Sequence, residues 1–86
     1  MILVNGRQLT KDHEGQYICF DGFNGRLDKY PLRKSECYRL HCVWSDGINI
    51  RKYGTPSHVK PSFVQLHRLD QRVQVISIDE FAKLPE

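Results

Sequence analysis

Basic and aromatic residues recur at two-residue spacing in the segment from Cys37 to Tyr53. Residues two apart in a strand project from the same face, so Arg39 and His41 should share one face, and so should Arg51 and Tyr53. Arginines contact phosphates and tyrosines stack on bases, which is how small β-domains bind single-stranded nucleic acid. With nearby basic residues added, the candidate binding residues are Arg39, His41, Arg51, Lys52, Tyr53, His58 and Lys60.

The same residue types also suit a protein partner, because Arg and Tyr are common anchors of protein interfaces. The second hypothesis is therefore a protein-interaction module or inhibitor that binds an acidic protein surface, as bacterial or phage accessory proteins do. A homodimer through an uncovered edge strand is a variant of this hypothesis. The remaining interpretation is a solvated strand face, whose arginines discourage edge-to-edge pairing.

Cysteines and histidines could in principle hold zinc, but their spacing argues against a metal site. No C-x2-C pair exists, and in an extended strand Cys37 and His41 lie about 13 Å apart. Cys42 should point to the opposite face from His41. Three cysteines are an odd number at irregular spacing, which favours reduced thiols over a disulfide scaffold. We expect no metal and no cofactor.

Enzymatic activity is not expected either. Cysteine catalysis needs a thiol beside a base that a third group orients, and Glu36 next to Cys37 disfavours a thiolate. The chain has no Gly-rich phosphate loop and no paired-carboxylate motif. The sequence therefore predicts a non-enzymatic binding module, with nucleic acid ahead of protein as the partner.

Composition predicts one folded domain spanning residues 1–86, with 40% hydrophobic and 27% charged residues. The net charge of +3 is uneven, because residues 26–72 hold ten Lys or Arg against four Asp or Glu. No apolar run approaches the roughly 20 residues that cross a bilayer. Polar residues after Met1–Val4 also argue against a signal peptide, so a cytoplasmic location without membrane contact is expected.

The Cys37–Tyr53 segment is expected to form a β-hairpin with a three-residue loop, Ser45–Gly47, in which Gly47 adopts a left-handed conformation. Trp44 would then lie opposite Ile48, and Cys42 opposite Ile50. This register predicts a core stripe of Tyr38, Leu40, Cys42, Trp44, Ile48 and Ile50. The opposite face would carry Arg39, His41, Val43, Asn49, Arg51 and Tyr53.

Two further hairpins are predicted from turn residues. Asn5-Gly6 suits a type I′ turn that places Ile2 across from Leu9. Segments 63–69 and 72–76 can pair around Asp70-Gln71, with Val64, Leu66, Val73 and Val75 on one face.

Between these hairpins, residues 16–20 read as a strand with Ile18 and Phe20 on one side and Tyr17 and Cys19 on the other. Residues 21–25 read as a tight reversal. Residues 26–36 suit either a strand or a helical turn, and 54–62 a long loop.

The chain end predicts a short helix over residues 78–84. Ser77 and Glu80 form a capping box, Ile76 and Phe81 a hydrophobic staple, and Pro85 stops the helix. Hairpins at short intervals with one terminal helix predict a mainly β fold, a small antiparallel curved sheet or barrel of SH3-like or OB-like size.

Overall fold

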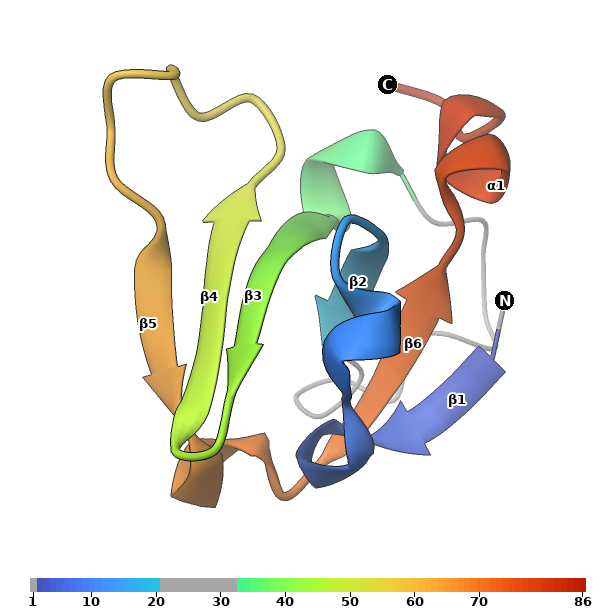
Figure 1. Ribbon diagram of the computed structural model, residues 1–86. Coiled ribbons are helices and arrows are strands. Elements are labelled where there is room, and N and C mark those ends of the chain that lie inside the picture. Colours follow the sequence, from blue (N-terminus) through green and yellow to red (C-terminus); the bar gives the residue numbers. More distant parts are fainter. Residues whose placement is uncertain (1, 21–32) are drawn as a thin grey trace.

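A computed structural model describes residues 2–20 and 33–86, which form one antiparallel sheet and a short C-terminal helix (Figure 1). The six strands lie in the order β1-β6-β2-β3-β4-β5. The strands are β1 (Ile2–Asn5), β2 (Tyr17–Phe20), β3 (Tyr38–Trp44), β4 (Gly47–Lys52), β5 (Ser62–Gln65) and β6 (Arg72–Ile76). The mainly β prediction is thus confirmed, although the sheet does not close into a barrel.

Short helices connect and cover the strands. The 3-10 helices are η1 (Gly6–Gln8), η2 (Lys11–His13), η3 (Lys34–Glu36) and η4 (Leu66–Leu69), and the α-helix is α1 (Ile78–Ala82). Within the described residues, no helix has the length and apolar character needed to cross a bilayer. The reversal predicted at 21–25 and most of the ambiguous segment 26–36 lie outside the described residues.

Two apolar clusters lie on opposite faces of the strand β2. Ile18 belongs to the main core, against which Phe20 packs. Cys19 belongs to a smaller cluster beneath α1, against which Tyr17 packs. The alternation predicted for this strand is therefore confirmed, because successive residues point to opposite faces. The buried residues of the main core are Leu9, Ile18, Leu40, Val43, Ile48, Ile50, Leu69, Val73 and Val75.

The central hairpin forms as predicted, but its register differs. Trp44 pairs with Gly47, so the loop has two residues, and Gly47 is not left-handed. A bulge between Leu40 and Cys42 then shifts the register so that Leu40 pairs with Ile50. Without the extra residue, Leu40 would oppose Arg51.

The bulge reverses three of the predicted side-chain directions. Val43 enters the core at 8% exposure, whereas Trp44 is 50% exposed and Cys42 is only half-buried. The sequence prediction assumed unbroken alternation through β3, and one inserted residue inverts the alternation beyond it. The core assignments of Cys42 and Trp44, and the outward assignment of Val43, are therefore wrong.

The predicted Asn5-Gly6 hairpin is also wrong. Asn5 caps η1 by accepting a hydrogen bond from the Arg7 N–H at 2.9 Å, and β1 pairs with β6 instead of with the residues that follow it. Gly6 fits where it does because a Cβ there would meet the Leu69 carbonyl oxygen at 2.5 Å. Here a local cap and a close tertiary contact override the turn preference.

The predicted pairing of segments 63–69 and 72–76 is also wrong, although the side chains predicted to point toward the core do so. β5 pairs with β4, and β6 pairs with β1 and β2, with η4 joining the two strands. Val73 and Val75 lie in the main core, and Val64 and Leu66 pack against it. Periodicity identified the buried face, but it carries no information on which strand is the neighbour.

The C-terminal capping box is confirmed. The Ser77 hydroxyl accepts from the Glu80 N–H at 3.1 Å, and the Glu80 carboxylate accepts from the Ser77 N–H at 3.1 Å. Ile76 and Phe81 share the smaller cluster, as the staple requires. The helix ends at Ala82, two residues earlier than predicted.

The register can be tested by substituting Val43 and Trp44, because it buries the first side chain and exposes the second. We expect Val43→Ala to lower the free energy of unfolding by about 2 kcal/mol, because it removes buried methyl groups. Trp44→Ala should cost less than about 1 kcal/mol despite the larger side chain, because half of it is exposed. Chemical denaturation measures both values. The opposite ranking would contradict the register.

Candidate functional site

The face of β3, β4 and β5 turned away from the main core, here called the outer face, carries two exposed aromatic rings. Trp44 is 50% exposed and Phe63 is 45% exposed. Phe63 pairs with Asn49 on β4, and Trp44 pairs with Gly47 on the same strand. The outer-face side chains of the three strands are Arg39, His41, Cys42, Trp44, Asn49, Arg51, Phe63 and Gln65.

Short contacts hold both rings in place. The Trp44 indole N–H donates to the Asn49 side-chain oxygen, and the Lys11 ammonium lies 5.5 Å from the ring centroid. The Phe63 ring lies over Gly47, where a Cβ would come within 2.5 Å of it. Both rings are thus positioned while a large part of each stays in contact with solvent.

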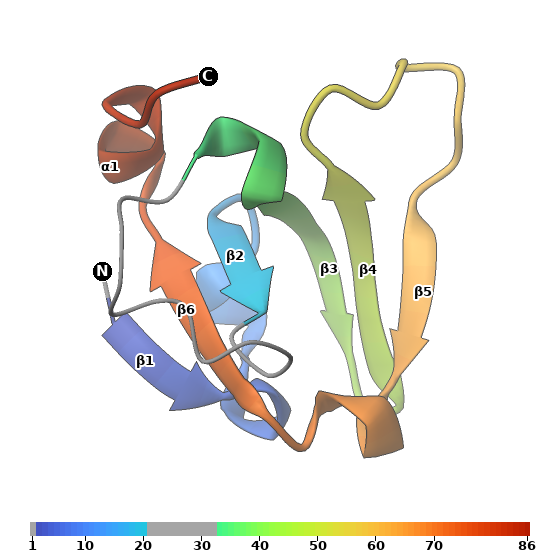
Figure 2. The same ribbon diagram turned by 180° about the vertical axis from the view of Figure 1, so that it is seen from behind.

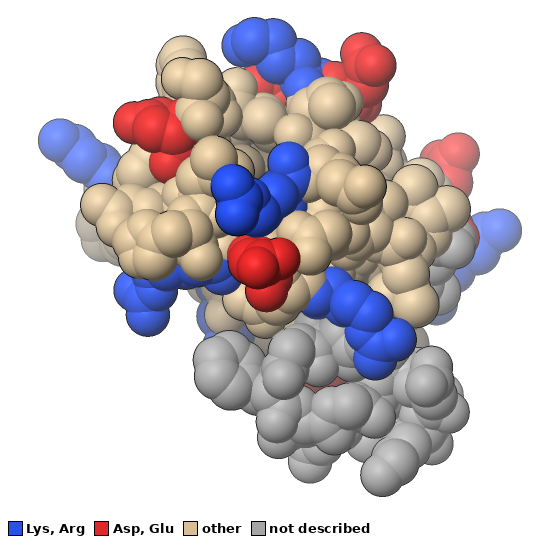
Figure 3. All heavy atoms as spheres, turned by 90° about the horizontal axis from the view of Figure 1, so that it is seen from below, with Lys and Arg blue, Asp and Glu red and all other residues tan. Residues whose placement is uncertain are grey.

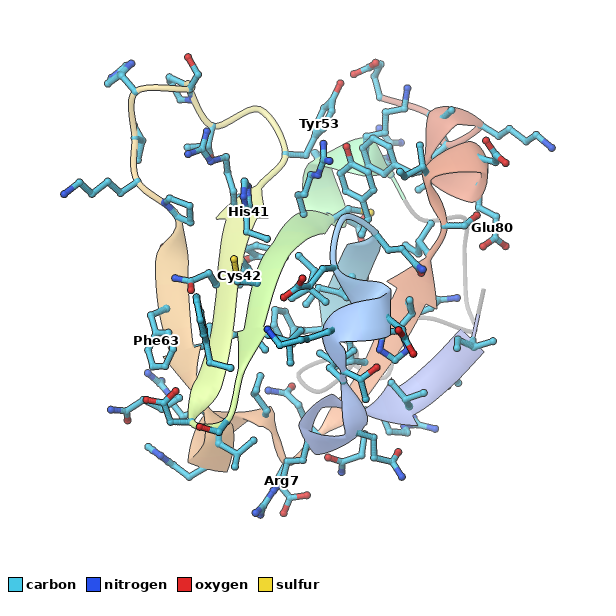
Figure 4. The ribbon with its side chains drawn as sticks, viewed as in Figure 1. Arg7, His41, Cys42, Tyr53, Phe63 and Glu80 are labelled. Carbon is cyan, nitrogen blue, oxygen red and sulfur yellow. The ribbon has the colours of Figure 1, made fainter. Side chains whose placement is uncertain are left out.

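The bulge in β3 determines what stands beside these rings. His41 is the extra residue, and it is exposed, while Cys42 follows on the outer face. In Figure 4, His41, Cys42 and Phe63 lie along the side of the sheet nearest the viewer. Bulges often re-aim side chains next to functional sites, and this one adds an imidazole to the outer face.

A pocket of about 230 Å³ opens where β3 and β4 meet the following loop, and we call it the cationic pocket. Its lining includes Arg39 and Arg51, which lie directly opposite each other on neighbouring strands. The pocket is lined by Tyr17, Arg39, His41, Arg51, Lys52, Tyr53, Gly54 and Thr55. Five of the seven predicted binding residues therefore meet in one place.

The other two predicted residues do not line this pocket. His58 is exposed in the loop between β4 and β5. Lys60 lines a separate pocket of about 190 Å³. Arg51 connects this loop to the sheet, because its guanidinium donates to the carbonyl oxygens of Val59 at 2.6 Å and Ser57 at 3.5 Å.

Aromatic contacts attach the pocket to the helix α1. The Tyr17 ring stacks on Phe81 with centroids 3.6 Å apart and the planes 4° from parallel. Tyr53 lies 5.2 Å from the same phenylalanine, and its hydroxyl donates to the Glu86 carboxylate at 3.3 Å. Figure 2 shows α1 and η3 at the same end of the molecule, where the Lys34 N–H donates to the Pro85 carbonyl at 2.8 Å.

The two arginines of the cationic pocket have no acidic partner among the described residues, although the Glu86 carboxylate lies at the rim beside Tyr53. Of the residues that the structure describes, no Asp or Glu forms an ion pair with Arg39 or Arg51, whereas Lys34 lies 3.5 Å from Glu86. Like charges directly opposite each other on two strands repel. Desolvation, then Arg51, then Arg39 lower the pKa of His41 below its usual 6.5. An anion in this pocket would relieve that repulsion.

The cysteines offer less chemistry. Burial, followed by the nearby Cys19 and Glu36, raises the pKa of Cys37 to about 12, so its thiol stays protonated at neutral pH. In the described part of the chain, no three His, Cys, Asp or Glu side chains gather as ligands for a metal ion. The placement of Cys37 therefore gives it a packing role.

Sequence reasoning missed Trp44 as a surface residue and did not select Phe63 for binding. Unbroken alternation through β3 predicts Trp44 in the core, whereas alternation in β5 predicts Phe63 outward, where the structure has it. Their signal was an aromatic residue in a polar context, next to Ser45 and Ser62 respectively. That signal is weak, because aromatic residues in strands are usually buried.

Neither protein-family models nor curated proteins nor solved structures give a match to this chain. Its chemistry must therefore be argued from the site alone.

The electrostatics of the pocket can be checked through His41. We expect its pKa to lie below 6.5, so that the ring is neutral at pH 7 and becomes charged only in more acidic solution. Replacing Arg39 with Gln should raise this pKa, because one repelling charge is lost. NMR titration of the imidazole protons measures the pKa.

The matched control is Arg7→Gln, which removes one positive charge at the opposite end of the molecule from Tyr53 (Figure 4). Figure 3 views the molecule from below, where Lys and Arg atoms are interspersed with those of Asp and Glu. The control should leave the pKa of His41 unchanged. An equal shift of the His41 pKa in both variants would show that this pKa responds to net charge and not to the neighbouring arginines.

Proposed function

We propose that this chain is a non-enzymatic module that binds single-stranded nucleic acid on its outer face. One observation carries the proposal: two exposed aromatic rings, Trp44 and Phe63, share a sheet face with a pocket whose arginines form no ion pair with a described Asp or Glu. Proteins that bind single strands combine these two features, aromatic platforms for bases and positive charge for the backbone.

The aromatic part of the face supplies base stacking. Each ring is about half exposed, and its hydrogen bond or packing partner restricts its motion. A base needs a free π-face to stack on, and every base has one, so this contact does not depend on sequence. Paired bases inside a duplex do not expose that face, which favours single strands over duplexes.

The cationic part supplies phosphate contacts. Arg39 and Arg51 carry permanent charge, and Lys52 and Tyr53 stand at the rim of the same pocket. Net charge supports the same partner, because the excess of basic residues lies in the segment that forms these strands. A strand crossing the outer face would place bases near Trp44 and phosphates near Arg39.

Removing the rings should weaken binding without unfolding the protein. We expect Trp44→Ala and Phe63→Ala each to cost about 1–3 kcal/mol of binding to a short single-stranded oligonucleotide, roughly a 5- to 150-fold loss. Fluorescence anisotropy measures the affinity. Ile78→Ala, which removes an equally exposed apolar side chain on α1, is the control and should bind normally. Unchanged affinity in both aromatic variants would exclude the stacking role.

Removing a cation should change the salt dependence. For single strands, each phosphate contact contributes about 0.7 to the slope of log affinity against log salt concentration. We expect Arg39→Gln to reduce that slope by about this amount, because one contact is lost. Arg7→Gln removes the same charge elsewhere and should leave the slope nearly unchanged. A slope that both variants alter equally would indicate a response to net charge alone.

The second candidate function is a protein-interaction module, favoured by the same exposed Trp44, Phe63 and Tyr53 beside arginines. Trp, Tyr and Arg dominate the energetics of protein interfaces. A second copy pairing through an edge strand, β1 or β5, is one form of this alternative. A complex that survives nuclease treatment and high salt would favour it over nucleic acid.

A further inference from the structure

The arrangement of the cationic pocket points to a specific ligand group within the proposed function. We infer that the pocket binds a phosphomonoester, the terminal phosphate of a strand whose bases lie on the outer face. The inference rests on the proposed function for the identity of the strand. Its support is the pair Arg39 and Arg51, which lie opposite each other on β3 and β4 and line one pocket, and the lack of an ion pair between either arginine and a described Asp or Glu.

Charge favours a terminal phosphate over an internal one. A phosphomonoester carries about −1.5 to −2 at pH 7, whereas each phosphate within a strand carries a single negative charge. The two arginines present permanent charges, and Lys52 adds a third at the rim. Arg39 and Arg51 repel each other across the two strands, so the more highly charged group relieves more of the repulsion.

Hydrogen-bonding capacity favours the same group. A monoester offers three strong acceptor oxygens. Two nitrogens of Arg51 donate to the loop carbonyls and its Nε–H is buried, so Arg51 acts on an anion mainly through its charge, while the exposed Arg39 and Lys52 supply accessible donors. Arg39 is exposed and lies 5.8 Å from the Tyr17 ring, so its guanidinium is held over an aromatic face beside the pocket.

Phosphate binding in the cationic pocket should change the protonation of His41. The charged and titratable groups around the pocket are Tyr17 from β2, Arg39 from β3, and Arg51, Lys52 and Tyr53 from β4 and its continuation. At the rim, the Glu86 carboxylate accepts from the Tyr53 hydroxyl and lies 3.5 Å from the Lys34 ammonium of η3. The helix η2, which packs against β3, brings Lys11, Asp12 and His13, and the Glu14 carboxylate accepts from the Val43 N–H at 2.8 Å. A phosphate dianion among these groups favours the charged imidazole, so binding should raise the pKa of His41.

The first experiment tests phosphate binding to the cationic pocket without an oligonucleotide. Inorganic phosphate and uridine 5′-monophosphate are added to the full chain, and the imidazole signals are followed by NMR, with His41 identified through its loss in His41→Gln. We expect both ligands to raise the pKa of His41. Arg39→Gln should lower the ligand affinity read from this response about tenfold, whereas Arg7→Gln should leave the affinity unchanged. No response to either ligand at millimolar concentration overturns the inference.

The second experiment compares two oligonucleotides of the same sequence, with and without a 5′-phosphate. We expect the phosphorylated strand to bind about tenfold tighter, the effect of one additional charge-assisted hydrogen bond. That advantage should disappear in Arg39→Gln and persist in Arg7→Gln. A strand carrying a 3′-phosphate instead identifies which end is bound, and an advantage at either end supports the inference.

The outcomes separate this inference from the proposed function. Equal affinity for the strands with and without a terminal phosphate overturns the inference, while binding of both leaves the proposed function intact. A response of His41 to phosphate without binding of any oligonucleotide supports the pocket as a phosphomonoester site and contradicts the nucleic-acid proposal.

Discussion

One extra residue in β3 determines which side chains of the central hairpin reach the core. The bulge between Leu40 and Cys42 realigns Leu40 with Ile50, so that four apolar side chains of β3 and β4 remain buried together. The same shift sends Trp44 outward and leaves His41 exposed. Burial requires this register, because a strand without the bulge would set Leu40 against Arg51. The composition of the outer face is thus a consequence of how the core is filled.

The rest of the proposed site depends on packing from other elements. The helix α1 fixes the Tyr17 ring through Phe81, and Arg51 connects the loop after β4 to the sheet. The bulge supplies His41, and Gly47 leaves room for the Phe63 ring. These contacts restrict the groups that would meet a ligand, which lowers the entropy lost on binding. A solvated face with only a solubilising role would not require such restriction.

Periodicity and capping chemistry predicted much of this fold. The two faces of β2, the inward residues of β6 and the cap at Ser77 depend on neighbouring residues alone, and all three are confirmed. Strand pairing and the bulge depend on contacts between residues distant in sequence, so the hairpins at Asn5 and Asp70 were wrong. Five predicted site residues, Arg39, His41, Arg51, Lys52 and Tyr53, do converge. The outward position of Trp44 was missed because local pattern alone does not reveal an inserted residue, whereas alternation already points Phe63 outward without marking it as a binding residue.

NMR mapping can show whether nucleic acid binds to the outer face. A ¹⁵N-labelled chain is titrated with an unlabelled oligothymidylate, and the shifts of backbone amides and of the single indole N–H are followed. We expect the signals of the Trp44 indole and of the amides around Arg39, Asn49 and Phe63 to shift together, while those of β1 and η1 stay in place. Shifts confined to β1 and η1, or none at millimolar oligonucleotide, would contradict binding to the outer face.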